Sequence, residues 1–213
     1  MKRLLFTLSM MLMVLTTSAQ PCPDDNHPHA IDLGLPSGTK WACCNVGANT
    51  PLDYGVHYAW GETVEKDSFD LNTYAHCDGR ISNCHDIGSD IAGTPYDVAH
   101  VKWGGNWVMP SQEQAKELFD NCNLSWATIS DVNGVMITSK VNNNYIFLPA
   151  AGETGFKKFE LFHVGKGGYY WSSTLHPSES GSAYTIHFYS EGLWCDFICA
   201  RPAGLCVRPI CVP

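Results

Sequence analysis

Charge is scarce in this chain, and positive charge is scarcer than negative charge. Only 16% of the 213 residues are charged, and 13 lysines and arginines stand against 21 aspartates and glutamates, which gives a formal net charge of −8. Excess carboxylates repel the phosphates of nucleic acids and of anionic lipids. The composition therefore argues against a nucleic-acid partner and against an anionic membrane surface.

Apolar runs long enough to span a bilayer are also absent. The longest one, residues 4–15, follows Lys2 and Arg3 and precedes Ala19, which is the pattern of a secretory signal peptide cleaved after residue 19. Loss of the two basic residues takes the formal charge from −8 to −10. We therefore predict an exported protein, in the periplasm, at the cell surface or secreted, with no membrane insertion after cleavage. A flexible leader, residues 20–29, is expected before a single domain, residues 30–213.

The common catalytic signatures are missing as well. The chain contains no Gly-x-Ser-x-Gly nucleophile elbow, no P-loop and no zinc-protease helix. It also lacks the Glu-Pro-Asn and Trp-Asn-Asp motifs on which calcium-dependent sugar binding relies in C-type lectins. The sequence therefore predicts no catalytic residue, no metal site and no cofactor, and disfavours a calcium-dependent lectin.

Cysteine, in contrast, is abundant. An exported chain makes disulfides the expected state of these residues, although their pairing cannot be read from the sequence. Local spacing predicts a bond between Cys77 and Cys84 and another between Cys195 and Cys199. The adjacent pair Cys43-Cys44 would point to opposite faces of a strand, so at most one of them would face the core. All ten follow the signal peptide: Cys22, Cys43, Cys44, Cys77, Cys84, Cys122, Cys195, Cys199, Cys206 and Cys211.

One pair of cysteines permits a second interpretation. His76-Cys77 and Cys84-His85 would supply two thiolates and two imidazoles, which is a sensible ligand set for zinc. The spacing differs from that of the usual zinc knuckles, and a disulfide flanked by two exposed histidines is the alternative.

The first half of the domain reads as short strands followed by a long irregular segment. Residues 30–42 form two β-like runs around Pro36-Ser-Gly, which predicts a hairpin, and residues 57–60 predict another short strand. Asp, Asn, Gly and His then dominate residues 63–105 with little periodicity. We expect an irregular insertion there.

One helix is predicted clearly, over residues 112–121. Ser111 can cap its first turn, and Gln114 completes a capping box. Ala115, Leu118 and Phe119 form an apolar face at helical spacing, which indicates core packing.

The rest of the chain is predicted to be mainly strands. We therefore expect an α+β domain of mostly short antiparallel strands, one clear helix and long loops. Residues 192–204 are predicted to be an exposed loop, and this loop carries aromatic residues where turns usually carry polar ones. The expected strands are residues 126–129, 135–138, 145–148, 169–173, 182–189 and 205–211.

Six segments also resemble a known family, the Fibrobacter succinogenes major paralogous domain. They are IDLGLPSGTKWACCNVGA (31–48), YAWGET (58–63), WVMPSQEQAKEL (107–118), FLPAAGE (147–153), YYWSST (169–174) and CVRPI (206–210). That family is similar in fold to C-type-lectin-like domains of the formylglycine-generating-enzyme type. The resemblance implies a domain whose two chain ends meet in one sheet, exported by gut-type bacteria.

Residues 173–208 further resemble the hypervariable segments that diversity-generating retroelements produce in proteins of this fold. The candidate positions hold amino acids that such mutagenesis can reach, whereas Glu179 and Trp194 cannot be reached and would have to be fixed scaffold. Ordinary divergence of a loop is the alternative explanation.

These observations predict a non-catalytic module that presents its C-terminal loops to a protein or glycan ligand. Apolar rings exposed in a loop are costly unless something covers them. Two alternatives stay open: an oxidase of the formylglycine-generating type that uses Cys195, Cys199 or Cys206, and a structural surface component. The rings could also fold back into the core. The predicted ligand-binding residues are Trp194, Asp196, Phe197, Ile198, Arg201, Tyr189, His187 and His176.

Overall fold

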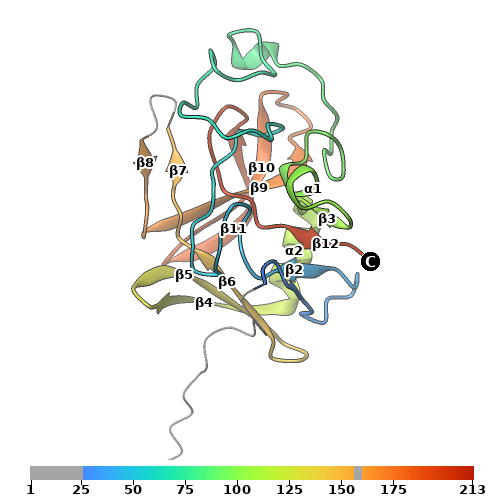
Figure 1. The fold of residues 1–213 in the computed structure, drawn as a ribbon, viewed down its shortest axis with the longest axis vertical. Coiled ribbons are helices and arrows are strands. Elements are labelled where there is room, and N and C mark those ends of the chain that lie inside the picture. Colours follow the sequence, from blue (N-terminus) through green and yellow to red (C-terminus); the bar gives the residue numbers. More distant parts are fainter. Residues whose placement is uncertain (1–25, 156–159) are drawn as a thin grey trace, which may run out of the picture.

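The computed structural model describes residues 26–155 and 160–213 (Figure 1). The predicted signal peptide, residues 1–19, and Cys22 lie outside this part of the chain. Most of the described elements are short antiparallel strands gathered in small sheets, with one long helix, so the α+β prediction is confirmed. No helix of the described residues is long and apolar enough to cross a bilayer.

The two ends of the domain meet in one four-stranded sheet. The predicted hairpin is formed by β1 (Ala30–Ile31) and β2 (Lys40–Ala42). Next to β2 lies β12 (Ile210–Cys211), and β3 (Trp107–Val108) completes the order β1-β2-β12-β3. The C-terminal strand therefore holds the N-terminal hairpin to the middle of the chain.

The predicted helix and meander follow β3. Helix α2 (Gln112–Asn121) begins at the capping box that the sequence predicts, with the Ser111 side chain accepting from the backbone N–H of Gln114. It leads into a second sheet, in the order β4-β5-β6. The strands of this sheet are β4 (Cys122–Ile129), β5 (Val132–Ser139) and β6 (Tyr145–Pro149).

A third sheet is built from the C-terminal part of the chain. Its strands are β9 (Gly167–Leu175), β10 (Ser182–Tyr189) and β11 (Gly192–Ala200), in the order β11-β10-β9. The prediction of a loop over residues 192–204 is wrong, because most of this segment is strand β11 paired along β10. Residues 205–211, predicted as a strand, contribute only β12.

Much of the predicted irregular insertion, residues 63–105, lies at the top of the molecule in Figure 1, and its last part lies lower, beside β3. It contains the 3-10 turn η1 (Ile81–Asn83) and a second helix, α1 (Val98–Trp103), which sequence reasoning missed. The Asp97 carboxylate caps α1 by accepting from the backbone N–H groups of Ala99 and His100. The predicted disulfide between Cys77 and Cys84 is present and closes the turn around η1.

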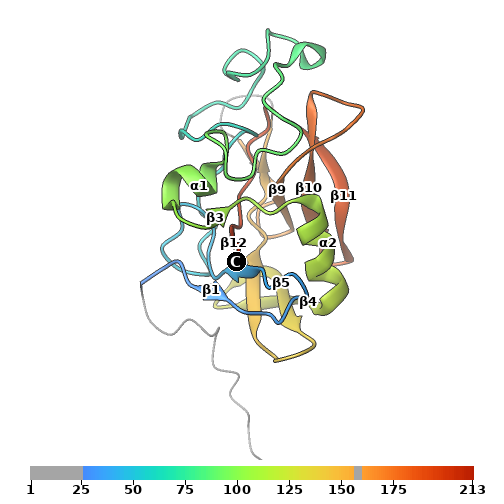
Figure 2. The same cartoon turned by 90° about the vertical axis from the view of Figure 1, so that its right-hand side faces the viewer.

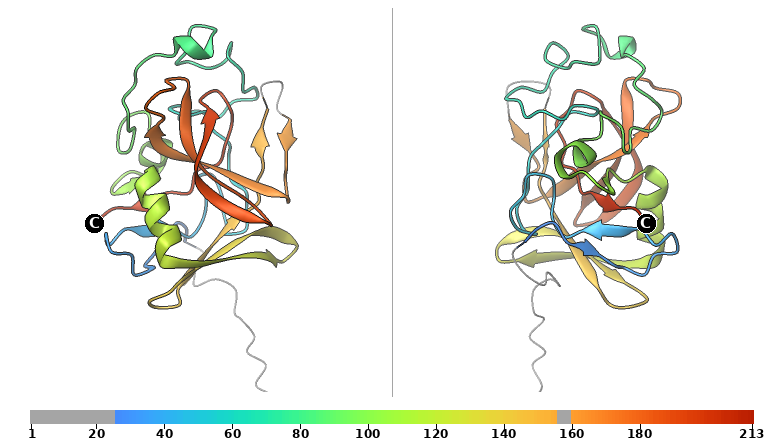
Figure 3. Two further views of the ribbon diagram at one scale, coloured as in Figure 1. Left: turned by 180° about the vertical axis from the view of Figure 1, so that it is seen from behind. Right: turned by 45° about the vertical axis from the view of Figure 1, so that its right-hand side comes forward.

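Two core clusters lie on opposite faces of the β9–β11 sheet. Tyr170, Ile186 and Phe188 point into one cluster, together with α2 and the β4–β6 sheet. Tyr169 and Trp171 point into the other, together with α1 and residues 46–60. Figure 2 and the left view of Figure 3 show α2 beside the strands of this sheet, with which it is in contact. The β9–β11 sheet is therefore buried on its α2 face, and only part of its other face is available to solvent.

A buried arginine ties these parts together. The guanidinium of Arg208, fully buried, donates to the Asn45 side chain (2.7 Å) and to the backbone carbonyls of Ala42, Cys43 and Phe147 (2.9–3.2 Å). These acceptors come from the end of β2, from the segment after it and from β6. The CVRPI segment thus places a cation where it donates to several buried acceptors from different parts of the chain.

Candidate ligand-binding site

The open part of the β9–β11 sheet carries a group of stacked rings, which we call the aromatic face. It is set by the strand register, which pairs His187 on β10 with Tyr169 on β9 and with Trp194 on β11. Because side chains alternate along a strand, Tyr189 projects to the same side as His187. The aromatic face consists of Tyr169, His187, Tyr189, Trp194 and Phe197.

Phe197 reaches this face through a β-bulge. The register of β10 against β11 shifts between Thr185 and His187, so that two residues of β11, Cys195 and Asp196, oppose Ile186 alone. Simple alternation would put Trp194 and Phe197, three residues apart, on opposite faces. The extra residue turns both rings to the same side.

The exposed rings lie over a buried histidine. His187 stacks on Tyr169 with a ring separation of 4.4 Å, and it contacts Phe197 at 4.7 Å and Trp194 at 5.7 Å. Only 7% of His187 is exposed, against 40% of Trp194 and 51% of Phe197. Two apolar rings therefore cover an imidazole and remain half open to solvent themselves.

The imidazole of His187 has no hydrogen-bond partner among the described residues, at either ring nitrogen. Burial lowers its pKa, and the charge of His163 lowers it further, so the ring is neutral near pH 7. A neutral imidazole offers one donor and one acceptor. A buried polar group left without partners costs about 1–3 kcal/mol, so its presence needs an explanation, and a functional role is one.

Polar groups line one side of the aromatic face. They come from the ends of the hairpin formed by β7 (Glu153–Thr154) and β8 (Leu161–Phe162), which lies beside the β9–β11 sheet in Figures 1 and 3. The His163 Nδ1 atom lies 3.3 Å from the Glu153 carboxylate and 3.2 Å from the Tyr169 hydroxyl. The Tyr169 hydroxyl also contacts that of Tyr189.

The protonation states of this rim follow from its burial. Burial raises the pKa of Glu153, although its contact with His163 opposes the change. Burial and the hydrogen bond with Tyr189 raise the pKa of Tyr169, which therefore stays a neutral phenol. Sequence reasoning missed Glu153, His163 and Tyr169, because nothing in their local sequence indicates that the β7–β8 hairpin lies next to β9 and β10.

The predicted site residues thus divide into three groups. Trp194, Phe197, His187 and Tyr189 come together on the aromatic face. Asp196 is exposed at the bulge, and Ile198, opposite Tyr184, projects from the other side of the sheet. His176 lies elsewhere, in ring contact with Tyr184 on the wall of a separate cavity of about 590 Å³.

Arg201 is not a surface residue, which corrects its predicted role. Only 1% of it is exposed. Its Nε donates to the Tyr74 hydroxyl (2.9 Å), and its Nη1 donates to the carbonyls of Ser180 (2.9 Å) and His85 (3.1 Å). The guanidinium also lies over the ring of Trp60. It joins the insertion to the β9–β10 loop and cannot orient an external ligand.

The prediction of a Cys195–Cys199 bond is also wrong, and both residues are free thiols. Four residues of extended strand span roughly 13 Å, far beyond the reach of a disulfide. Their side chains pack into different core clusters on opposite faces of the sheet. Burial raises the pKa of Cys199 and that of Cys206, each to about 12, so neither is a ready thiolate.

Two further cysteine predictions are settled by the structure. The zinc interpretation of Cys77 and Cys84 fails, because a disulfide consumes both thiolates, while His76 contacts the Gly61 carbonyl and His85 pairs with Asp78. Cys43-Cys44 departs from expectation as well: both are buried, since strand β2 ends at Ala42 and the chain bends through them.

Comparison of the chain with models of protein families, with curated proteins and with solved structures finds no match. The chemistry of the aromatic face is therefore the basis for inferring function. A surface of this kind can stack on a flat or apolar group and can offer hydrogen bonds from its buried imidazole and its polar rim.

Proposed function

We propose that this protein is an exported, non-catalytic binding module that presents its aromatic face to a protein or glycan ligand. We further propose that the domain is C-type-lectin-like and belongs with the Fibrobacter succinogenes major paralogous domains that its sequence resembles. The observation that carries the binding role is the pair of half-exposed rings, Trp194 and Phe197, above a buried imidazole without a partner. The meeting of both chain ends in one sheet supports the family proposal.

The area left open on the two rings is large enough to matter energetically. A Trp and a Phe bury roughly 150–250 Å² each when covered, and 40% of Trp194 and 51% of Phe197 remain exposed. A ligand that covers both would remove roughly 200 Å² of apolar surface from water, a gross gain of about 5 kcal/mol before the costs of association. That is the scale of a hot spot in a binding interface.

The surroundings favour a protein ligand over a glycan. Three exposed apolar residues, Leu161, Phe162 and Val164, flank His163 and extend the apolar surface beyond the aromatic face. Strand β11 is an edge of its sheet among the described residues, and an edge strand can pair with a strand of a partner. A glycan would use the rings and the polar rim but would gain little from the flanking apolar residues.

The thiols support a role without redox catalysis. An oxidising cysteine needs a lowered pKa, supplied by a nearby cation or helix terminus. Burial instead raises the pKa of each of the three candidates, Cys195, Cys199 and Cys206. Arg201, the cation closest in sequence to Cys195 and Cys199, is engaged with Tyr74 and with backbone carbonyls. The charge of Arg208 lowers the pKa of Cys206, but the effect of burial is larger.

The test compares variants of the aromatic face with a matched control. Wild-type protein is screened against a displayed peptide library and a glycan array, and the affinities of the selected ligands are measured by calorimetry. We expect Trp194→Ala combined with Phe197→Ala to weaken binding at least tenfold. Leu124→Ala removes a similarly exposed apolar side chain from β4 and should leave binding unchanged.

Stability measurements separate loss of binding from loss of fold. Each ring is about half buried, so each substitution should cost only about 1–2 kcal/mol of unfolding free energy, less than the cost of emptying a full core site. Selected ligands that bind the double variant and the wild type equally would refute the proposal. Failure of both libraries to yield any ligand would count against it as well.

A further inference from the structure

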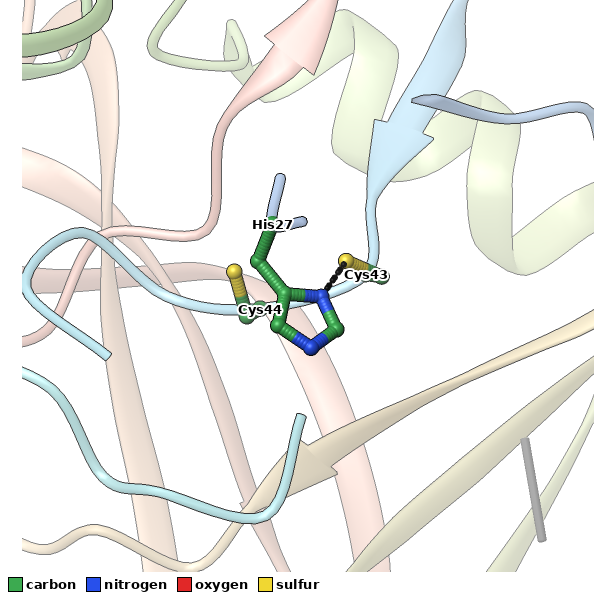
Figure 4. A group of neighbouring side chains, drawn as sticks. All are labelled: His27, Cys43 and Cys44. Carbon is green, nitrogen blue, oxygen red and sulfur yellow. Dashed lines mark hydrogen bonds between the residues drawn. The ribbon is translucent and has the colours of Figure 1, made fainter. Parts of the chain in front are cut away.

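A second site is formed where the predicted flexible leader meets the end of strand β2. The ligand atoms of His27, Cys43 and Cys44 all lie within 4.8 Å of one another (Figure 4). Among the described residues no other group of three or more His, Cys, Asp and Glu side chains is gathered so closely. We propose that these three residues bind a thiophilic metal ion, and that Zn²⁺ is the ion that suits them.

The distances are those of a ligand shell that is nearly assembled. Donor atoms bound to a tetrahedral zinc ion, at about 2.0–2.3 Å from the metal, lie roughly 3.3–3.8 Å from one another. His27 Nδ1 lies 3.3 Å from Cys43 Sγ. His29 Nδ1 lies 3.8 Å from the same sulfur and can supply a fourth donor. Since no separation in the group of three exceeds 4.8 Å, closing it around an ion requires a movement of at most about 1 Å.

Backbone pairing positions these donors. The Cys43 N–H donates to the His29 carbonyl (3.0 Å), and the His29 N–H points back to the Cys43 sulfur (3.1 Å). Beyond β2 the chain bends, so the two adjacent sulfurs gather at one place instead of pointing to opposite sides of a strand (Figure 4). The site is therefore built from secondary structure on one side and from a bend on the other.

Burial and charge suit a metal held by thiolates. Cys43 and Cys44 are 0% and 1% exposed, whereas His27 and His29 are half-buried and cover the site from outside. The Arg208 guanidinium donates to the Cys43 carbonyl, which places a fixed positive charge next to the cysteines. Two thiolates, one divalent ion and neutral imidazoles carry no net charge together, so the assembled site can lie next to that arginine at little electrostatic cost.

The donor chemistry selects the class of ion. Thiolate and imidazole ligands suit zinc and other thiophilic ions, whereas calcium and magnesium require oxygen ligands, which this group lacks. Mixed sulfur and nitrogen donors in a buried place are typical of structural zinc sites. Such an ion would fasten residues 27–29 to the segment after β2 and stabilise the start of the domain.

The experiment uses the full chain with its Cys77–Cys84 disulfide intact, stripped of metal with a chelator and titrated anaerobically with Co²⁺ as the spectroscopic probe. We expect one equivalent to bind, with a thiolate-to-cobalt charge-transfer band and the intense visible bands of tetrahedral cobalt, and Zn²⁺ to displace it. Cys44→Ser and His27→Gln should each weaken binding at least tenfold. Cys211→Ser and His85→Gln alter a half-buried free thiol and an exposed histidine elsewhere, and should leave it unchanged.

Zinc should also raise the melting temperature of the wild type but not that of His27→Gln, which changes a half-buried side chain and leaves the core intact. Three results would overturn the proposal. The first is the absence of a charge-transfer band in the wild type. The second is that the control substitutions weaken Co²⁺ binding as much as Cys44→Ser and His27→Gln do. The third is a peptide map of the unreduced protein that places Cys43 or Cys44 in a disulfide. A Cu⁺ titration that outcompetes zinc would keep the site and change the ion.

Discussion

Acid should destabilise this fold, and the largest single contribution should come from a buried histidine, His57. Burial lowers its pKa from 6.5 to about 4, although hydrogen bonds with the backbone of Gly152 and Ala151 oppose the change. The unfolded chain takes up a proton near pH 6.5, whereas the folded protein resists protonation until about pH 4. The stability that neutral His57 contributes is therefore complete above pH 6.5 and is lost as the pH falls from 6.5 to about 4.

The size of the effect follows from the shift. One pKa unit corresponds to about 1.4 kcal/mol, so the full contribution is about 3 kcal/mol, of which about 2 kcal/mol should be lost between pH 7 and pH 5. Burial also lowers the pKa of His76 and His187, which adds acid sensitivity of the same sign. On acidification the wild type should accordingly lose more unfolding free energy than His57 alone explains.

The measurement is urea unfolding of the wild type and of His57→Gln at pH 7, 6 and 5. The variant is less stable at pH 7 but should lose about 2 kcal/mol less than the wild type on going to pH 5. His85→Gln, a substitution of an exposed histidine, should retain the wild-type pH dependence. If the free energy of unfolding fell equally with pH in the wild type and in His57→Gln, the reasoning would be refuted, because His57 would then titrate alike in the folded and unfolded chains.

Two further predictions concern the buried arginines. Arg208→Met should lower the free energy of unfolding, measured with denaturant, by about 3–5 kcal/mol, because several buried acceptors lose their donor. Arg80→Met, at an exposed position, should lower it by under about 0.5 kcal/mol. A loss below about 1 kcal/mol for Arg208→Met would contradict this account. Arg201→Met should speed amide hydrogen exchange in residues 63–97 and leave the amides of β10 protected. The reason is that the Arg201 side chain donates to the Tyr74 hydroxyl and to the His85 carbonyl, both in the insertion. Unchanged exchange in residues 63–97 would show that other contacts hold the insertion.

Elements with a strong local signal were predictable from the sequence. Helix α2 has a capping box at Ser111 and an apolar stripe that includes Ala115 and Leu118, and both features are present as expected. Turn residues between β-prone runs predicted the β1–β2 hairpin and the β4–β6 meander. In each case the information lies within a few residues along the chain.

Strand β11 lacks such a signal. Its sequence, GLWCDFICA, does not alternate between apolar and polar residues, because the bulge at Cys195 and Asp196 interrupts the period. The exposure of Trp194 and Phe197 was expected from their place in a predicted loop, but their common face was not. Arg201 was misplaced for a related reason: an arginine that donates to one hydroxyl and two carbonyls of distant residues looks the same in sequence as one at the surface.

The extended state of β11 also explains why two mistaken expectations share one cause. A bond between Cys195 and Cys199 would have to bring their Cα atoms to within about 7 Å, which is incompatible with a strand that separates them by roughly 13 Å. A loop closed in that way could not pair with β10, and its residues would lose the register that sets Trp194 opposite His187. The free thiols and the shared orientation of the two exposed rings are therefore consequences of the same strand pairing. A binding surface on this protein depends on β11 being a strand, and oxidation of these two cysteines to one another would require that strand to come apart.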